Sequence, residues 1–113
     1  MHELSIVLSI VDQVQDEVFK LDAKTVKRIE LEIGNLAGVE WQSFDFAWQP
    51  ATKNTVLEHA ERIVNRVPAI ALCSDCEHEF EKEEAYDPCP KCGNYLHHLK
   101  SGKELKIKSI LIE

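Results

Sequence analysis

The chain has 113 residues and a mass of 12.9 kDa, the size of one compact domain or of one domain with a small metal-held module. With 44% apolar residues and few glycines and prolines, it can bury a core and is not a disordered tail. The formal charge of -7 without a basic stretch disfavours nucleic acid, and the lack of a long apolar run or signal-peptide pattern disfavours a membrane. We therefore expect a cytoplasmic protein.

The first predicted element is an amphipathic helix over residues 4–21. Apolar residues recur there at three- and four-residue steps. They are Leu4, Val7, Leu8, Val11, Val14 and Val18. Residues 28–33 then alternate strictly between apolar and polar, which predicts a half-buried strand that Gly34 ends.

A second, shorter helix is expected from about residue 40 to 49, closed by Pro50. Its aromatic stripe should belong to the core: Trp41, Phe44, Phe46 and Trp48. Residues 56–67 suit a strand ended by Pro68, and residues 105–112 suit a further strand after a turn. Because a lone terminal strand needs a partner, we expect it to return to the first sheet.

The cysteines form two Cys-x-x-Cys pairs, Cys73 with Cys76 and Cys89 with Cys92. Two such turns supply the four tetrahedral ligands that zinc requires, and the spacing is typical of a zinc ribbon. Four thiolates leave no position for water, so this zinc should be structural. Two disulfides or a redox dithiol are the competing interpretations, and a reducing cytoplasm and the lack of a thioredoxin-like unit weigh against both.

Three histidines, His78, His97 and His98, lie near the cysteines. Such histidines are mostly surface groups or neighbours of ligands, but an imidazole can replace a thiolate on zinc. The sequence leaves open whether any of them binds the metal.

The chain opens Met1-His2-Glu3. The amine of Met1, the backbone nitrogen of His2 and its imidazole can close two chelate rings on one ion, and nitrogen donors in a plane suit Ni(II) or Cu(II). We expect Met1 to be retained, because a bulky second residue hinders its removal. Glu3 can add a carboxylate, and so can Glu40 if the two helix starts are adjacent. From the residues alone, the ordinary interpretation is favoured for both side chains, because any protein can have His at position 2 and the helix dipole favours a carboxylate such as Glu40 in a first turn.

Besides the cysteine pairs, three stretches of the chain carry recognisable motifs: residues 1–5, residues 31–46 and residues 101–110. They carry Met-His-Glu-Leu-Ser, then Leu-Glu-Ile-Gly with later Gly-Val and two phenylalanines, then Ser-Gly-Lys-Glu-Leu-Lys-Ile-Lys-Ser-Ile. Together they resemble the HypA/HybF family of hydrogenase-maturation nickel metallochaperones over essentially the whole chain.

The resemblance implies an α+β fold: a two-helix, three-stranded nickel domain of residues 1–68 plus 101–113 with an inserted four-cysteine, zinc-ribbon-like domain of residues 69–100. It implies that His2 is the main ligand of the transient Ni(II) cargo, with Met1 and Glu3 supporting it. Glu40 falls where some relatives place an acidic ligand. Cys73, Cys76, Cys89 and Cys92 correspond to the structural Zn(II) ligands.

The resemblance further implies a carrier and not an enzyme. Its partners would be a HypB-type GTPase and the large subunit of a [NiFe]-hydrogenase, with urease accessory proteins for some relatives. Nucleic acid and membrane are not expected partners, and a monomer and a dimer both remain open. The alternative function is a zinc-ribbon adaptor for protein or nucleic acid, which would be indifferent to His2.

Overall fold

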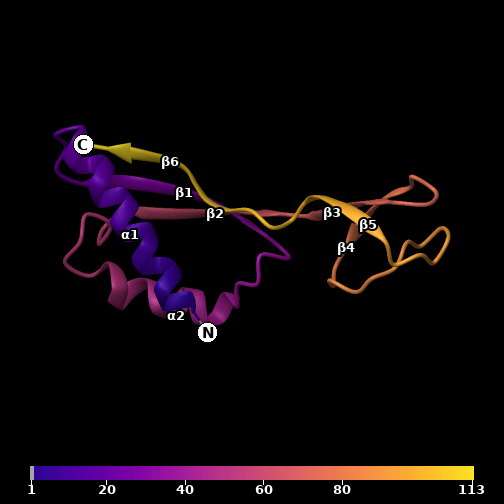
Figure 1. Cartoon of the computed structure of the whole chain (residues 1–113). Helices are drawn as coiled ribbons and strands as arrows, with labels where there is room; N and C mark the ends of the chain where they lie inside the picture. The colour runs from indigo at the N-terminus through magenta and orange to yellow at the C-terminus, as the bar shows by residue number, and fades with distance from the viewer. Residues whose placement is uncertain (1) are drawn as a thin grey trace. The chain divides into compact units, whose positions relative to one another are not determined.

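The computed structural model describes residues 2–113, which form two helices and two three-stranded sheets (Figure 1). In chain order the elements are α1 (Glu3–Lys20), β1 (Val26–Gly34), α2 (Trp41–Thr52), β2 (Glu61–Val67), β3 (Ala69–Cys73), β4 (Glu79–Lys82), β5 (His97–Ser101) and β6 (Leu105–Ile112). This confirms the α+β class. Within these residues, neither helix is both long and apolar enough to cross a bilayer.

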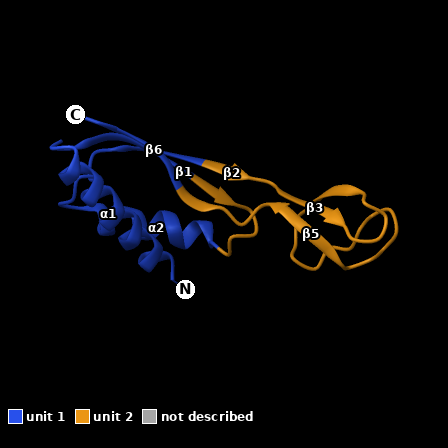
Figure 2. Cartoon of the chain, turned by 45° about the horizontal axis from the view of Figure 1, so that its top comes forward, with its two compact units in different colours: residues 1–31, 39–64, 107–113 blue, residues 32–38, 65–106 orange. Residues whose placement is uncertain are grey.

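The chain divides into two compact units, coloured separately in Figure 2. The first comprises the chain up to Leu31 with residues 39–64 and 107–113, and the second comprises residues 32–38 and 65–106. The predicted insert of residues 69–100 falls within the second unit. Its assignment as a separate zinc domain stays a prediction.

Helix α1 buries one face, as its periodicity predicts. The buried apolar residues are Val7, Ile10, Val11, Val14 and Val18. The expected stripe was wrong at two positions, because Leu4 and Leu8 are 51% and 46% exposed. Ile10 is buried instead, so the buried face of the helix is rotated away from the face that the sequence pattern indicated.

The first sheet has the strand order β2-β1-β6, which confirms that the terminal strand returns to β1. Ion pairs join Lys106 to Glu32 at 3.4 Å and Lys108 to Glu30 at 3.7 Å. Residue numbers rise along β1 where they fall along β6, so the two strands are antiparallel. The inward residues of β1 are almost fully buried: Ile29, Leu31 and Ile33.

Helix α2 begins at Trp41, with Glu40 as its N-cap, and continues through Pro50 to Thr52. The expectation that Pro50 closes the helix was therefore wrong. Proline removes one backbone donor, but the Thr52 hydroxyl donates to the Trp48 carbonyl at 2.8 Å and holds the last turn. Placing the whole aromatic stripe in the core was also wrong at Phe46, which is 85% exposed, whereas Phe44 is fully buried.

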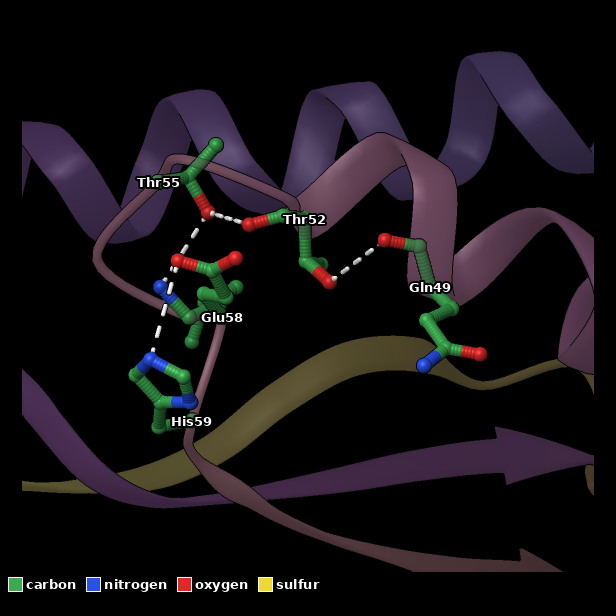
Figure 3. Close-up of polar contacts among 6 residues, drawn as sticks. Gln49, Thr52, Thr55, Glu58 and His59 are labelled. Carbon is green, nitrogen blue, oxygen red and sulfur yellow. Dashed lines mark hydrogen bonds and ion pairs between the residues drawn. The ribbon is translucent and has the colours of Figure 1, made fainter.

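Strand β2 begins at Glu61 and not at residue 56, because the preceding segment is a turn stabilised by threonine hydroxyls (Figure 3). The Thr55 hydroxyl donates to the Thr52 carbonyl at 2.6 Å and accepts from the Leu57 N–H at 3.2 Å. Leu57 is fully buried from within this turn. The sequence pattern placed this apolar residue in a strand, whereas in the structure it lies in a turn and packs into the core.

The second sheet has the order β4-β3-β5, with both outer strands antiparallel to β3. The hydrophobic cluster of this sheet and its loops is small, with four buried residues and two partly buried ones packed against them: Ala71, Cys73, Phe80 and Cys89, then Cys76 and Leu99. Two of the four buried residues of this cluster are cysteines. So small an apolar core needs an additional source of stability.

Candidate metal centres

The four cysteines come together at one end of the second sheet. Cys73 is the last residue of β3, Cys76 lies in the turn after it, and Cys89 and Cys92 lie in the connection between β4 and β5. Their sulfur atoms all lie within 4.8 Å of one another, with the Cys73–Cys92 pair at 3.5 Å and the Cys76–Cys89 pair at 3.6 Å. A tetrahedral zinc with bonds of about 2.3 Å places its sulfurs about 3.8 Å apart, so the donor set fits zinc.

The two Cys-x-x-Cys loops share one backbone hydrogen-bond pattern. In each loop, the residue directly after the second cysteine donates its backbone N–H to the carbonyl of the first cysteine. The N–H of the first cysteine donates to the carbonyl of the residue two positions after the second cysteine. These bonds are Glu77 N to Cys73 O (3.2 Å), Cys73 N to His78 O (2.9 Å), Gly93 N to Cys89 O (2.8 Å) and Cys89 N to Asn94 O (2.9 Å). The loops therefore present the two cysteine pairs in the same way.

The first cysteine of each pair is set up to ionise. The N–H of Cys76 donates to the sulfur of Cys73 and, against the effect of burial, lowers the pKa of that thiol to about 7. Burial would raise the pKa of Cys89, but the N–H groups of Cys92 and Lys91 and the neighbouring thiols lower it. Hydrogen bonds to a thiolate favour the charged form.

The second cysteine of each pair has a raised pKa. The N–H of His78 would lower the pKa of Cys76, but burial and the adjacent thiols raise it. The N–H of Asn94 would lower the pKa of Cys92, but the other thiols and burial raise it to about 12. A bound cation would supply the positive charge that lets all four ionise.

None of the three nearby histidines belongs to the group of ligand atoms found among residues 2–113. His97 is the cross-strand partner of Cys73, but both of its ring nitrogens are engaged. Its Nε2 lies 2.6 Å from the ammonium of Lys82 and its Nδ1 lies 2.9 Å from the carbonyl oxygen of Tyr95. Because an ammonium can only donate, Nε2 accepts and Nδ1 carries the proton.

His78 and His98 are placed differently from His97. The ring of His78 stacks on Phe80, with the centroids 6.3 Å apart. His98 pairs with Leu72 across the strands, one residue along from the pairing of His97 with Cys73.

The second candidate centre is the start of α1. His2 is the N-cap of this helix; its side chain makes no capping hydrogen bond and is exposed. The next residue, Glu3, is only 6% exposed, and its Oε2 accepts the backbone N–H of Glu40 at 3.2 Å. The structure therefore brings Glu3 to the start of α2, as expected if the helix starts are adjacent.

The carboxylate of Glu40 is occupied by its own helix. Its oxygens accept the N–H of Ser43 at 2.6 Å and of Gln42 at 3.3 Å. The hydroxyl of Ser43 lowers the pKa of Glu40 most, and these two N–H groups lower it further. The pKa of Glu3 is lowered mainly by the N–H of Glu40. The Met1 amine lies outside the described residues, and among residues 2–113 no second group of three or more His, Cys, Asp or Glu ligand atoms comes together.

Two features of these centres were not foreseen from the sequence. Lys82 is 2% exposed, although five glutamates surround it in residues 77–84, a composition typical of a solvated hairpin. Glu77 has a φ of 60°, in the same left-handed region as Gly93 at 77°. The positive φ of Glu77 could have been predicted from one signal, because Glu77 follows its cysteine pair as Gly93 follows the other.

The geometry defines the class: a small α+β protein with a cluster of four cysteines that could hold a metal ion. The family described as "Hydrogenase/urease nickel incorporation, metallochaperone, hypA" matches residues 1–112. The chain belongs to this family, which confirms the resemblance. It is 45% identical to the hydrogenase maturation factor HypA of Parabacteroides distasonis over 113 residues, covering 100% of this chain and 98% of that protein.

Other relatives agree. The chain is 42% identical to hydrogenase maturation factor HypA of Chlorobium phaeobacteroides, with 100% of both chains covered. In fold it is similar to the solution structure of the Ni metallochaperone HypA from Helicobacter pylori, with a TM-score of 0.68 at 24% identity, covering 99% of this chain and 97% of that one.

Proposed function

We propose that this chain carries Ni(II) on a chelate formed by the Met1 amine, the backbone nitrogen of His2 and the His2 imidazole. Three nitrogen donors from two residues leave a fourth position through which the ion can be passed on by ligand exchange. The observation that carries the proposal is the match to a nickel-incorporation family over residues 1–112 in a chain whose His2 imidazole is exposed at the start of α1.

The recipient is a [NiFe]-hydrogenase large subunit, with a HypB-type GTPase acting alongside and urease accessory proteins as the alternative recipients. The family is one of hydrogenase and urease nickel incorporation, and its relative in Parabacteroides distasonis is a hydrogenase maturation factor, which supports this class of recipient. The carrier works in the cytoplasm as a monomer or a dimer and breaks no covalent bond of its own.

The cysteine cluster holds a structural Zn(II). Four thiolates fill a tetrahedral zinc completely, so its chemistry there is to crosslink the two loops and not to activate water. Two of the four zinc ligands, Cys73 and Cys89, are buried at 1% exposure each. The other two ligands, Cys76 and Cys92, lie nearer the surface.

A nickel titration of tag-free, zinc-loaded protein tests this proposal. Wild type should bind about one nickel per chain with the absorption spectrum of a planar site, and His2→Ala should lose that spectrum. His59→Ala is the matched control, because His59 is 92% exposed and should leave binding unchanged. If His2→Ala binds as wild type does, the N-terminal site is wrong and the zinc-ribbon adaptor becomes the better account.

A further inference from the structure

The buried carboxylate of Glu3 has a partner that metal ligation does not explain. Glu3 is the first residue of α1, and its side chain points to the other helix, where Oε2 accepts the N–H of Glu40 at 3.2 Å. A carboxylate that is only 6% exposed loses most of its hydration. A hydrogen bond from a backbone donor offsets that cost, and bonds to charged acceptors are the stronger ones.

Glu40 extends this contact into α2. Its backbone N–H is held by Glu3, while its side chain accepts the N–H groups of Ser43 at 2.6 Å and Gln42 at 3.3 Å. Without such an acceptor, these donors at a helix start have no partner within the helix. One residue therefore receives the contact from α1 and fixes the first turn of α2.

The position of Glu3 in the chain gives this contact a consequence for the nickel donors. Glu3 directly follows His2, so the tie fixes the α1 turn that presents the His2 backbone nitrogen and imidazole. We propose that Glu3 is a positioning residue, which ties the nickel-binding start of α1 to the first turn of α2 and is not itself a nickel ligand. This inference rests on the proposed function of His2.

The same geometry limits Glu40. To bind nickel, its carboxylate would have to give up one or both capping bonds at the start of α2. Ligation by Glu40 would therefore compete with the first turn of α2, whereas the tie through Glu3 uses only the backbone of Glu40 and leaves the cap intact.

Glu3→Gln and Glu3→Ala separate the two roles. Glutamine keeps an acceptor oxygen at the same reach but is a poor metal ligand, whereas alanine removes the acceptor. Glu17→Ala, at an exposed position of the same helix, is the matched control for the loss of a glutamate. Circular dichroism establishes that each variant is folded, and if Glu3→Ala is not, Glu3→Gln carries the test.

The first readout is hydrogen exchange of the Glu40 amide by NMR in zinc-loaded, nickel-free protein. Exchange should be about tenfold faster in Glu3→Ala, since a bond to a charged acceptor is lost, and within about threefold of wild type in Glu3→Gln and Glu17→Ala. The second readout is the nickel dissociation constant, which should be about tenfold weaker for Glu3→Ala and within about threefold of wild type for Glu3→Gln.

Two results would overturn the inference. An unchanged Glu40 amide in Glu3→Ala would show that the tie does not exist. Loss of nickel in Glu3→Gln as complete as in Glu3→Ala, with the Glu40 amide still protected, would make Glu3 a ligand. If wild type itself takes up no nickel, the proposed function fails, while the amide exchange still decides whether Glu3 ties the helices.

Discussion

Glu77 is a non-glycine residue in a backbone conformation that favours glycine. Its φ of 60° matches that of Gly93, and both residues follow the second cysteine of a pair. For a residue with a Cβ, the left-handed region costs about 1–2 kcal/mol. The first loop therefore stores strain that the second loop avoids.

Exchanging the residue types at these two positions should have opposite effects. Glu77→Gly should raise the free energy of unfolding by about 1 kcal/mol, because the relief of strain exceeds the entropy that glycine adds to the unfolded chain. Gly93→Ala should lower it by about 1 kcal/mol through strain alone, since a Cβ there meets nothing within 4 Å. Denaturant unfolding at a fixed excess of zinc measures both. Equal destabilisation by the two substitutions would show that the loops are not equivalent.

At the scale of elements, Gly34 marks a close approach of two backbone segments in the second unit. The N–H of Gly34 donates to the Glu104 carbonyl at 2.7 Å, and the N–H of Leu36 donates to the Gly102 carbonyl at 2.7 Å. A Cβ on Gly34 would lie 2.0 Å from the carbonyl oxygen of Gly102. Backbone atoms on both sides leave no flexible side chain to move away.

Gly34→Ala should therefore be strongly destabilising, by about 3 kcal/mol or more, because the end of β1 must separate from the chain before β6. Gly38→Ala is the control: it has a φ of 83° but open space around a Cβ, so it should cost only about 1 kcal/mol. Thermal unfolding followed by circular dichroism compares them. A Gly34→Ala protein as stable as Gly38→Ala would contradict the close approach.

Periodicity predicted which elements exist better than it predicted where they end. The strict alternation around Ile29 and Leu31 identified β1, because both residues face one buried side. The end of α2 and the start of β2 depend on the hydroxyls of Thr52 and Thr55, which take part in local hydrogen bonds that no repeat encodes. Leu57 could not be placed for a similar reason, because a buried residue in a turn does not belong to a repeating pattern of apolar residues.

The sequence indicated that the four cysteines come together, but it did not indicate which contacts the residues of the two candidate centres make. The Cys-x-x-Cys spacing singled out the four cysteines, since such loops bring paired ligands to one point. The hydrogen bond from Glu40 to Glu3 joins residues far apart in the chain, so no local pattern could reveal it. The contact of Lys82 with His97 likewise depends on how β4 and β5 pair with β3.

At the scale of the whole molecule, the two units should respond differently to loss of the metal. Among the described residues, the hydrophobic cluster of the second sheet has Ala71 and Phe80 as its buried members besides two cysteines. The first unit buries a row of apolar residues from α1 and also Phe44 and Leu57. We therefore expect metal binding to supply a large part of the folding free energy of the second unit.

Removing zinc with a chelator should collapse the NMR chemical-shift dispersion of residues 69–101 while the amides of α1 stay protected. Cys73→Ser should give the same spectrum without a chelator, and added zinc should restore dispersion only in wild type. Unchanged dispersion of residues 69–101 in metal-free protein would show that the metal does not hold this unit together.

If the proposed function is right, nickel binds at the amine and imidazole of the first two residues. The most direct measurement compares nickel binding by tag-free wild type with that by protein whose Met1 amine is acetylated, since acetylation leaves every side chain in place. We predict that acetylated protein keeps its zinc and its fold but loses the planar-site spectrum and the stoichiometry of about one nickel per chain. Equal nickel binding by both forms, with the same spectrum, would contradict the account.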